Sequence, residues 1–554
     1  KDFYKKNIRF VFRPTRTYGM LLNQSLEPRL LRDPVLWSIN IDLLARAISK
    51  PEIRGDYLWP LIKSEIFSME QLDIPYITTS SSSNDLNVPD GKIIENFFEE
   101  PGYDRALECL KGLSHEDMDK QVAFIYGALY ARNREKPGAM SQECDIPAGT
   151  AGQEDFLEQA LLTGKELKEC AISFGDEGLT WIGYEYVPQS DRFQLQPLGY
   201  NLYNGICGVT LFLSALDMVS GKDIFRETIL SALKPLFKDL DDNIMSEIIA
   251  AEMGIGGTSG LGSIVYSLVS ISHFLKMPEI MDYAEKAALL IEEQVEKDGA
   301  FDIIYGSAGA IAGLIKFYNA VKEQKILDIA RKCGTHLIEN LKETPSGYRA
   351  WATLGNRFMG GFSHGVAGIA CSLLRLYSLT GEVKYIDAVK EAILYENTLF
   401  SPHYGNWLDL RVSSDKPERE RFMTAWCQGA PGIAIGRIGC LSVLDTEEIR
   451  KDIDIALDTT IKCPLLERDH VCCGNFGIGE ILFTSGLKLN RVDLIEKGLF
   501  KASQIVSMAK YRGTFNCGIG GYYDPAFFQG ISGSGYELLR MIEPDIIPSV
   551  LMLE

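Results

Sequence analysis

One short glycine pattern returns seven times between residue 200 and the end of the chain, and it limits the possible folds more than any other feature. In each occurrence a glycine, two further residues and a second glycine precede an apolar run with helical spacing. The first glycines are Gly205, Gly257, Gly306, Gly365, Gly429, Gly474 and Gly530. They are 45 to 64 residues apart, which is typical of one supersecondary unit per repeat.

Each repeat is expected to contain about two helices, as Ile369–Tyr377 and Asp387–Glu396 illustrate in the fourth. A glycine ahead of a helix lets the chain turn sharply and lets neighbouring backbones approach closely. Seven helical hairpins can form either an open solenoid or a closed ring. We expect a ring, because every glycine turn precedes one helix of its pair and the turns would gather at one end. The predicted fold class is mainly α, an α/α toroid of seven helical-hairpin repeats.

The first 195 residues lack the repeat, and a chain of 554 residues is expected to hold two or more domains. Ile8–Phe12 alternates like a strand, and helical segments are expected near Ser38–Ser49, Gly91–Phe98 and Lys120–Arg132. The strand-like stretch Leu179–Leu198 leads into the first repeat. We therefore predict an α+β domain over residues 1–195 and the toroid over residues 196–554.

Charge and composition exclude several classes of protein. The formal net charge of -19 argues against nucleic-acid binding, which requires a basic face. No apolar run approaches the roughly 18 residues of a membrane span, and the first residues lack the apolar core of a signal peptide. The chain also starts without a methionine, so we expect a fragment or a processed product.

Twelve cysteines in a chain of this length are too dilute for a disulfide scaffold, and we expect a cytoplasmic protein with reduced thiols. Most are isolated within apolar helical patterns, where a buried free thiol is the simplest interpretation. The five clearest examples of this kind are Cys109, Cys207, Cys333, Cys371 and Cys440.

Three repeats carry thiols or an imidazole at their glycine turns, namely His364, Cys427, and the adjacent pair Cys472 and Cys473. In a ring these turns lie together. Thiolates combined with imidazole are ligands that Zn²⁺ prefers, and three protein ligands leave a fourth position for water or substrate. Spacing alone leaves the alternative of buried free thiols open, because adjacent cysteines rarely bind one ion.

The sequences around these thiols resemble the metal motifs of lanthionine cyclases, and they read Trp426-Cys427-Gln-Gly-Ala-Pro-Gly432 and Cys472-Cys473-Gly-Asn. Residues 196–554 as a whole resemble the LanC-like cyclase domain of class II lanthipeptide synthetases, the LanM type. The resemblance implies one Zn²⁺ held by Cys427, Cys472 and Cys473. The second motif is commonly Cys-His-Gly, so Cys473 stands at the histidine position, as in the Cys-Cys-Gly subgroup. Three thiolates give the site a formal charge of -1, which should make a bound substrate sulfur a stronger nucleophile.

The implied reaction is a Michael-type addition of a peptide cysteine to dehydroalanine or dehydrobutyrine, which forms a (methyl)lanthionine thioether. By motif, His364 is the candidate acid or base for the enolate, although a histidine at a helix start can also be only a capping residue. Asp302 matches the family's active-site aspartate and would handle or orient a proton. Related stand-alone cyclases can carry an arginine where this chain has Met423. Neither Arg421 nor Arg437 can be assigned that role by motif, so the enolate-stabilising group stays open.

Two N-terminal stretches resemble the dehydratase domain of the same synthetases, and they run from Arg9 to Tyr18 and from Glu65 to Pro75. The resemblance implies that residues 1–195 are the C-terminal part of a kinase-like domain that phosphorylates Ser or Thr and then eliminates phosphate. Arg9, Arg13 and Thr15 match the elimination residues; the alternative is that these arginines are solvated or paired with carboxylates. No glycine-rich phosphate loop is present, so ATP and Mg²⁺ are expected to serve only the full-length dehydratase.

The resemblance implies a precursor peptide as substrate, with a leader and a core that contains Ser, Thr and Cys. It also implies a bacterial, cytoplasmic enzyme and, as a further partner, a transporter for the product. Other toroidal activities are the rivals. A glycosidase needs two carboxylates facing a sugar cleft, and a zinc prenyltransferase favours a mixed Asp, Cys and His set. A peptide-binding scaffold whose thiols only hold the ring together is the non-catalytic alternative.

Overall fold

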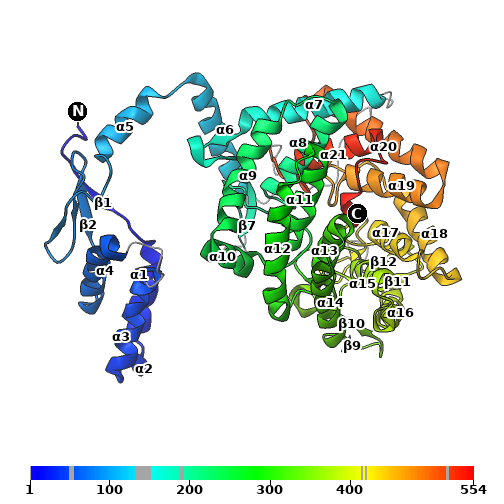
Figure 1. Cartoon of the computed structure of the whole chain (residues 1–554), viewed down its shortest axis with the longest axis horizontal. Helices are drawn as coiled ribbons and strands as arrows, with labels where there is room; N and C mark the ends of the chain where they lie inside the picture. The colour runs from blue at the N-terminus through cyan, green and yellow to red at the C-terminus, as the bar shows by residue number, and fades with distance from the viewer. Residues whose placement is uncertain are drawn as a thin grey trace. The chain divides into compact units, whose positions relative to one another are not determined.

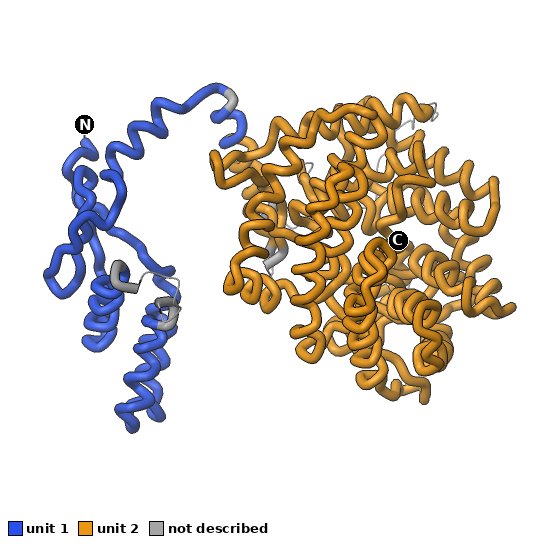
Figure 2. The backbone as a smooth tube through the Cα atoms, in the orientation of Figure 1, with its two compact units in different colours: residues 1–121 blue, residues 122–554 orange. Residues whose placement is uncertain are grey.

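The computed structural model describes residues 2–48, 55–132, 151–187, 192–413, 416–417, 421–518 and 523–554. The chain divides into two compact units, residues 1–121 and residues 122–554 (Figure 2). Within these described ranges, no helix combines the length and the apolar character that crossing a membrane requires.

Unit 1 is an α+β structure, as the sequence predicts. Its antiparallel sheet has the order β1 (Asn7–Phe10), β2 (Ile77–Ser80), β3 (Leu86–Asn87) and β4 (Ile93–Ile94). The helices are α1 (Thr15–Ser25), α2 (Pro28–Leu31), α3 (Pro34–Asp42), α4 (Gly55–Glu70) and α5 (Gly102–Lys111). The expected helix at Gly91–Phe98 is wrong: Ile93 and Ile94 pair with β3 and form the last strand. α6 (His115–Arg132) contains the helical segment expected at Lys120–Arg132.

Unit 2 is an α/α toroid with a ring of seven inner helices, so the predicted fold class is confirmed (Figure 1). These helices are α8 (Ile206–Ser220), α11 (Leu261–Leu275), α13 (Ser307–Val321), α15 (Val366–Thr380), α17 (Ala430–Cys440), α19 (Asn475–Leu489) and α21 (Ile531–Ile542). Each inner helix packs against the next, and α21 packs against α8, which completes the ring. They are buried along nearly their whole length because the interior surrounds them on all sides.

Seven outer helices pack on the inner ring. They are α9 (Arg226–Asp241), α12 (Ile280–Gln294), α14 (Gln324–Glu339), α16 (Val383–Asn397), α18 (Glu447–Ile461), α20 (Val492–Arg512) and α7 (Gln153–Cys170). The last of these, α7, precedes the first repeat in sequence and packs against α21 through a face that includes Phe156, Ala160 and Leu167. The seventh outer helix is therefore supplied by residues that precede position 195, and the domain boundary predicted there stays a prediction.

Short elements complete unit 2. α10 (Asn243–Met253) follows α9, and the hairpin of β7 (Ile182–Val187) and β8 (Arg192–Pro197) precedes the first repeat. Three antiparallel pairs of two-residue strands are β5 (Ile172–Ser173) with β6 (Leu179–Thr180), β9 (Lys342–Glu343) with β10 (Arg349–Ala350), and β11 (Phe400–Ser401) with β12 (Asn406–Trp407). The C-terminal residues lie near the middle of the ring, where Leu551 is buried and its carbonyl accepts a hydrogen bond from the indole of Trp426 (Figure 1).

A glycine is the N-cap of every inner helix: Gly205, Gly260, Gly306, Gly365, Gly429, Gly474 and Gly530. In the second repeat the N-cap is Gly260 and not Gly257, so the sequence alignment of that repeat was wrong by three residues. The preceding loop folds back across the helix start and leaves no room for a side chain. A Cβ on Gly474 would lie 2.5 Å from the carbonyl oxygen of His470, and one on Gly477 would lie 2.1 Å from that of Val471.

Backbone hydrogen bonds join neighbouring glycine turns around the ring, and this series is termed the turn belt. The six N–H to O=C bonds are Tyr203 to Thr258 (2.8 Å), Gly257 to Ile303 (2.9 Å), Ile303 to Ser363 (3.1 Å), Ser363 to Cys427 (3.3 Å), Cys472 to Phe528 (2.9 Å) and Phe528 to Tyr203 (3.0 Å). Among the described residues, no such bond joins the turn of Cys427 to the turn of Cys472. The belt therefore links six of the seven seams between neighbouring turns.

Candidate active site at the turn end of the ring

The turn belt places the residues singled out by the sequence at one end of the ring. Cys427 and Cys472 each lie two residues before the N-cap glycine of their helix, and both are belt residues. His364 directly follows the belt residue Ser363, and Asp302 directly precedes the belt residue Ile303. Positions far apart in the sequence thus lie on consecutive turns.

Asp302 and His364 form a pair. The Oδ2 atom of Asp302 lies 2.7 Å from Nδ1 of His364, and its other oxygen accepts the backbone N–H of Tyr305 at 2.8 Å. The Asp302 carboxylate is therefore an acceptor on both sides, which assigns the proton of the ring to Nδ1 and leaves Nε2 for exchange. Asp302 is almost fully buried, whereas 14% of the His364 side chain is exposed, so the imidazole is the member of the pair that solvent or substrate can reach.

Tyr305 packs against this pair. Its ring stacks on the imidazole of His364 with centroids 5.9 Å apart. Loss of hydration around its hydroxyl raises the pKa of Tyr305, and the nearby carboxylates of Asp302 and Glu185 raise it further.

The thiols of Cys427, Cys472 and Cys473 interact across the seam that lacks a belt bond. The pKa of Cys427 is held well below its usual range because the thiols of Cys472 and Cys473 donate to its sulfur and because Arg411 is nearby. The donating role raises the pKa of Cys472 well above its usual range and that of Cys473 to about 12. The three thiols therefore lie close enough to shift one another's pKa.

The three thiols are not arranged as a preformed metal site. Across the described ranges, no group of three or more His, Cys, Asp or Glu side chains has the arrangement of a metal site. The donor chemistry nevertheless fits Zn²⁺, because three cysteines on two neighbouring turns offer soft sulfur ligands, and no described cysteine is engaged in a disulfide. The five cysteines predicted to be buried thiols are buried except for Cys109, which is exposed.

Two side chains that the sequence did not single out touch the thiol cluster. The hydroxyl of Tyr203 donates to Sγ of Cys472 at 3.3 Å, and the Tyr203 ring stacks on Phe528 at 4.8 Å. Tyr203 stands two residues before its N-cap glycine, as Cys427 and Cys472 do, so aligning the repeats on their N-caps would have found it. Both terminal nitrogens of Arg411 lie 3.9 Å from Sγ of Cys427. Arg411 lies in the loop after β12, outside the repeat, and no sequence pattern marks it.

Of the two arginines considered for the position of Met423, Arg437 has other partners. Arg437 is fully buried and pairs with Glu396 at 2.7 Å and with Asp452 at 3.1 Å, away from the thiols. The carbonyl of Arg421 accepts the backbone N–H of Asp409 at 2.8 Å. Met423 itself contacts Arg411, whose Nη2 lies 3.2 Å from the Met423 sulfur.

The elimination residues predicted in unit 1 have different environments. Arg13 donates from Nε to Glu65 at 2.9 Å and from Nη2 to the Leu44 carbonyl at 2.8 Å, and Glu65 also accepts from the Tyr18 hydroxyl. The two dehydratase-like stretches therefore meet through Glu65. Arg9 and Thr15 are exposed, and the guanidinium of Arg9 lies 5.7 Å from the centre of the Tyr76 ring. A role of these three residues in phosphate elimination stays a prediction.

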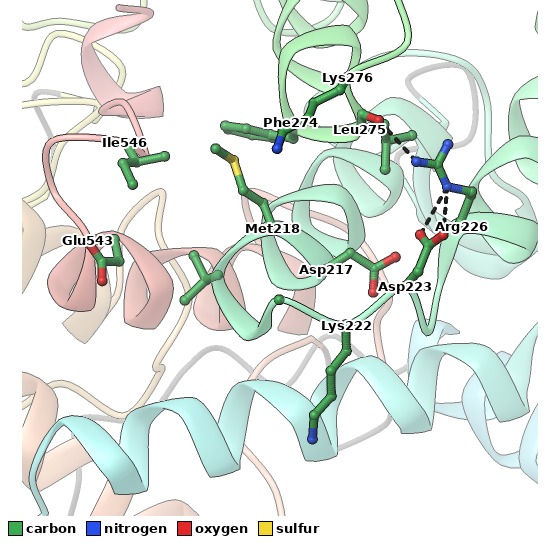
Figure 3. A pocket seen from close by; sticks show the side chains of 12 residues that line it. Asp217, Met218, Lys222, Asp223, Arg226, Phe274, Leu275, Lys276, Glu543 and Ile546 are labelled. Carbon is green, nitrogen blue, oxygen red and sulfur yellow. Dashed lines mark hydrogen bonds and ion pairs between the residues drawn. The ribbon is translucent and has the colours of Figure 1, made fainter.

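A pocket of about 440 Å³ lies away from the thiol cluster (Figure 3). It is lined by residues at the C-terminal ends of α8 and α11, whereas the glycine turns are at their N-terminal ends. Three of its charged residues have structural partners: Arg226 pairs with Asp223 at 2.9 Å, and Asp217 accepts the backbone N–H of Phe225. The pocket therefore has no part in the chemistry of the turn end.

Seven helix pairs in a ring, with a buried carboxylate–imidazole pair and three interacting thiols at the turn end, define an α/α toroid with a thiol centre. The family model described as lanthionine synthetase C-like protein matches residues 196–552. This match covers more than half of the chain, so the chain belongs to the lanthionine synthetase C-like family. A domain of unknown function, DUF4135, matches residues 1–80.

Individual proteins are similar to this chain at low sequence identity. The lacticin 481/lactococcin biosynthesis protein LcnDR2 of Lactococcus lactis subsp. lactis is 24% identical over 573 residues, which cover 100% of this chain and 57% of that protein. The chain thus spans little more than half the length of this curated relative. Among solved structures, a nisin cyclase is 16% identical with a TM-score of 0.49 and covers 72% of this chain and 96% of its own. The Lin0763 protein of Listeria innocua is 11% identical with a TM-score of 0.42, over 71% of this chain and 98% of its own.

Proposed function

We propose that residues 196–554 form a zinc-dependent lanthionine cyclase that acts on dehydrated precursor peptides. Family membership supports an enzyme of lanthipeptide cyclisation. The observation that carries the zinc proposal is the coincidence of two features at one seam. Cys427, Cys472 and Cys473 bring their sulfurs together there, and among the described residues it is the one seam without a belt hydrogen bond.

The ion would be held by these three cysteines, with the fourth position left for substrate. When bound, Zn²⁺ lowers the pKa of a peptide thiol and thereby supplies thiolate at neutral pH. Because Cys473 contributes a third sulfur where an imidazole is common, the ligand set carries more negative charge. This negative charge would weaken the bond between zinc and the substrate sulfur and so leave that sulfur more nucleophilic.

The Asp302–His364 pair is suited to move the proton that the addition requires. The substrate sulfur loses its proton and forms a bond to the β-carbon of the dehydroamino acid, the carbon–carbon π bond breaks, and a proton is added at the α-carbon. No atom is gained or lost overall. Nε2 of His364 delivers the proton, while Asp302 keeps Nδ1–H in place and stabilises the charged ring.

For residues 1–195 we propose a part in the preceding dehydration of Ser and Thr by a kinase-like domain, for which the full-length protein would use ATP and Mg²⁺. The substrate would be a precursor peptide with a leader, in the bacterial cytoplasm, with export by a transporter. The elimination half can be tested by incubating the chain with a phosphoserine peptide and following loss of phosphate by mass. Arg9→Ala should slow this loss if the exposed Arg9 takes part, and an unchanged rate would remove it.

The cyclase proposal is tested with a synthetic peptide that contains one dehydroalanine and one cysteine. Cyclisation conserves mass, so remaining thiols are counted by alkylation before mass spectrometry. The unmodified chain should bind about one Zn²⁺ and consume the thiol, and Cys427→Ala should lose both properties. Cys109→Ala is the matched control, because Cys109 is exposed and lies in unit 1. Cyclisation by metal-free Cys427→Ala would refute the proposal, and zinc binding without cyclisation would favour a peptide-binding scaffold.

A further inference from the structure

The guanidinium of Arg411 contacts the thiol cluster. Its Nη1 and Nη2 atoms both lie 3.9 Å from Sγ of Cys427. Among the described residues, no other arginine or lysine donates a hydrogen bond to Cys427, Cys472 or Cys473. The cluster therefore has one cation in direct contact.

The geometry of Arg411 is fixed by Asp409. The carboxylate accepts from Nε at 3.0 Å and from Nη2 at 2.8 Å, and it also accepts the backbone N–H of Arg411 at 2.9 Å. Asp409 is almost fully buried, whereas 28% of the Arg411 side chain is exposed. A two-point ion pair of this kind holds the guanidinium plane in one orientation, so that its outer edge faces the sulfur.

The contact between Arg411 and Cys427 would offset negative charge at a zinc site made of three thiolates. Three thiolates around a divalent cation leave a net charge of -1, and a fourth, substrate thiolate makes it -2. Cys472 and Cys473 are adjacent in the chain, so this charge is concentrated on one side of the seam. A guanidinium held against Cys427 offsets one unit of charge without occupying a coordination position.

We propose that Arg411 is a positioning residue whose charge allows the three-cysteine set to hold a metal ion and a substrate thiolate together. The inference rests on the proposed zinc site and deepens it. Arg411 acts through Cys427, because both of its terminal nitrogens face that sulfur. Arg411 thus places a positive charge beside Met423, which has no charge of its own, from a loop outside the repeat.

Zinc affinity, measured by competition with a chromophoric chelator, tests the role directly in the full chain. Arg411→Gln should weaken zinc binding by roughly tenfold to a hundredfold, the usual effect of removing a side chain that supports a metal ligand. Arg411→Lys, which keeps the charge but not the two-point contact, should have an intermediate effect. Arg357→Gln is the control, because Arg357 donates to the carbonyls of Leu410 and Arg411 and so supports the same loop without touching a thiol.

A comparison of double variants shows whether Arg411 acts through its charge or only by ordering its loop. Cys473→His replaces one thiolate by a neutral imidazole, so the site needs less compensation. The loss caused by Arg411→Gln should therefore shrink by at least severalfold in the Cys473→His background. Moving the charge in Arg411→Gln/Met423→Arg should recover part of the affinity. A purely structural Arg411 would give equal losses in both backgrounds and no recovery.

The outcomes distinguish this inference from the proposed function. If the unmodified chain binds no zinc, the zinc site itself is refuted. If it binds zinc and cyclises peptide but Arg411→Gln leaves the affinity unchanged, only the role of Arg411 is refuted. Equal losses in Arg357→Gln and Arg411→Gln would also overturn it, because loop order and not charge would then control the site. The charge-transfer absorption of the Co²⁺-substituted protein gives a second readout: Arg411→Gln should shift the band.

Discussion

The seam between Ser363 and Cys427 and the seam between Cys427 and Cys472 differ in how the ring is joined. At the first, the backbone N–H and the hydroxyl of Ser363 both donate to the Cys427 carbonyl, at 3.3 Å and 3.1 Å. At the second, no backbone bond is found among the described residues, and the thiols meet instead. The comparison teaches that the toroid keeps its own backbone links where adjacent turns only need to be held. Among the described residues it has no such link where the thiols of two turns come together.

Removing metal should have the largest effect, and only at the Cys427–Cys472 seam. A ligand that binds the folded state alone adds about 4 kcal/mol to the free energy of unfolding when its free concentration is ~1000 times its Kd. We therefore expect chelation to lower the stability of unit 2 by about that amount. It should also accelerate deuterium exchange in the two turns that carry Cys427 and Cys472.

The Ser363–Cys427 seam provides the internal control for this experiment, because its backbone bonds need no ligand. Exchange at Ser363 should change little on chelation. Equal acceleration at both seams would mean that metal stabilises the ring globally. Unchanged exchange at the thiol seam, in protein shown to have lost its zinc, would refute a linking role.

Replacing His364 tests whether the seam between Ser363 and Cys427 takes part in catalysis without taking part in metal binding. It follows Ser363 and pairs with Asp302, and within the described part of the chain no hydrogen bond joins it to the thiols. His364→Asn should leave zinc stoichiometry unchanged and slow ring formation by roughly 100- to 10,000-fold, the usual contribution of a general acid or base. Thiol-alkylation kinetics measure the rate and atomic absorption measures the metal. Loss of zinc in this variant would place His364 in the metal site instead.

The seven repeats and the ring could be predicted from the sequence because glycine is required wherever a loop folds back onto a helix start. The same rule misled at the second repeat, where Gly257, Gly260 and Gly262 all stand close together and only the structure shows which one is the N-cap. The contribution of α7 to the ring could not be predicted. Its amphipathic pattern shows that one face is buried, but not that this face packs on α21, which lies at the other end of the chain.

Some residues of the candidate site could be predicted from the sequence, and others could not. Cys427, Cys472, His364 and Asp302 stand in motifs at glycine turns, so the repeat itself places them at one end. Arg411 lies in a loop of no regular pattern, and its contact with Cys427 follows from the path of that loop after β12. Arg13 matches an elimination motif, yet its bond to the buried Glu65 appears only when two distant stretches pack together.

Replacing Asp302 should slow cyclisation less than replacing His364. Asp302 lies at the neighbouring seam, where the backbone N–H of Ile303 donates to the Ser363 carbonyl. Asp302→Asn keeps the size of the side chain, but its amide no longer fixes the imidazole with the proton on Nδ1. We expect cyclisation to slow on the order of a hundredfold, as for a misoriented catalytic group, with zinc binding intact. The pair should behave as one unit: in His364→Asn, adding Asp302→Asn should cost little more. Additive losses would show that the two residues act separately.

The smallest predicted effect concerns the Ser363 hydroxyl, which adds a second donor to an existing backbone link at the intact seam. Ser363→Ala removes the 3.1 Å bond to the Cys427 carbonyl but keeps the backbone N–H. We expect the free energy of unfolding to fall by about 1 kcal/mol, with zinc affinity nearly unchanged, because the carbonyl retains one donor. Denaturant unfolding measures the first quantity and chelator competition the second. Ser378→Ala is the matched control, because its hydroxyl bonds only to Leu374 within its own helix. A tenfold loss of zinc affinity in Ser363→Ala alone would show that the two seams are mechanically coupled, and the contrast between a backbone-linked and a ligand-linked seam would then fail.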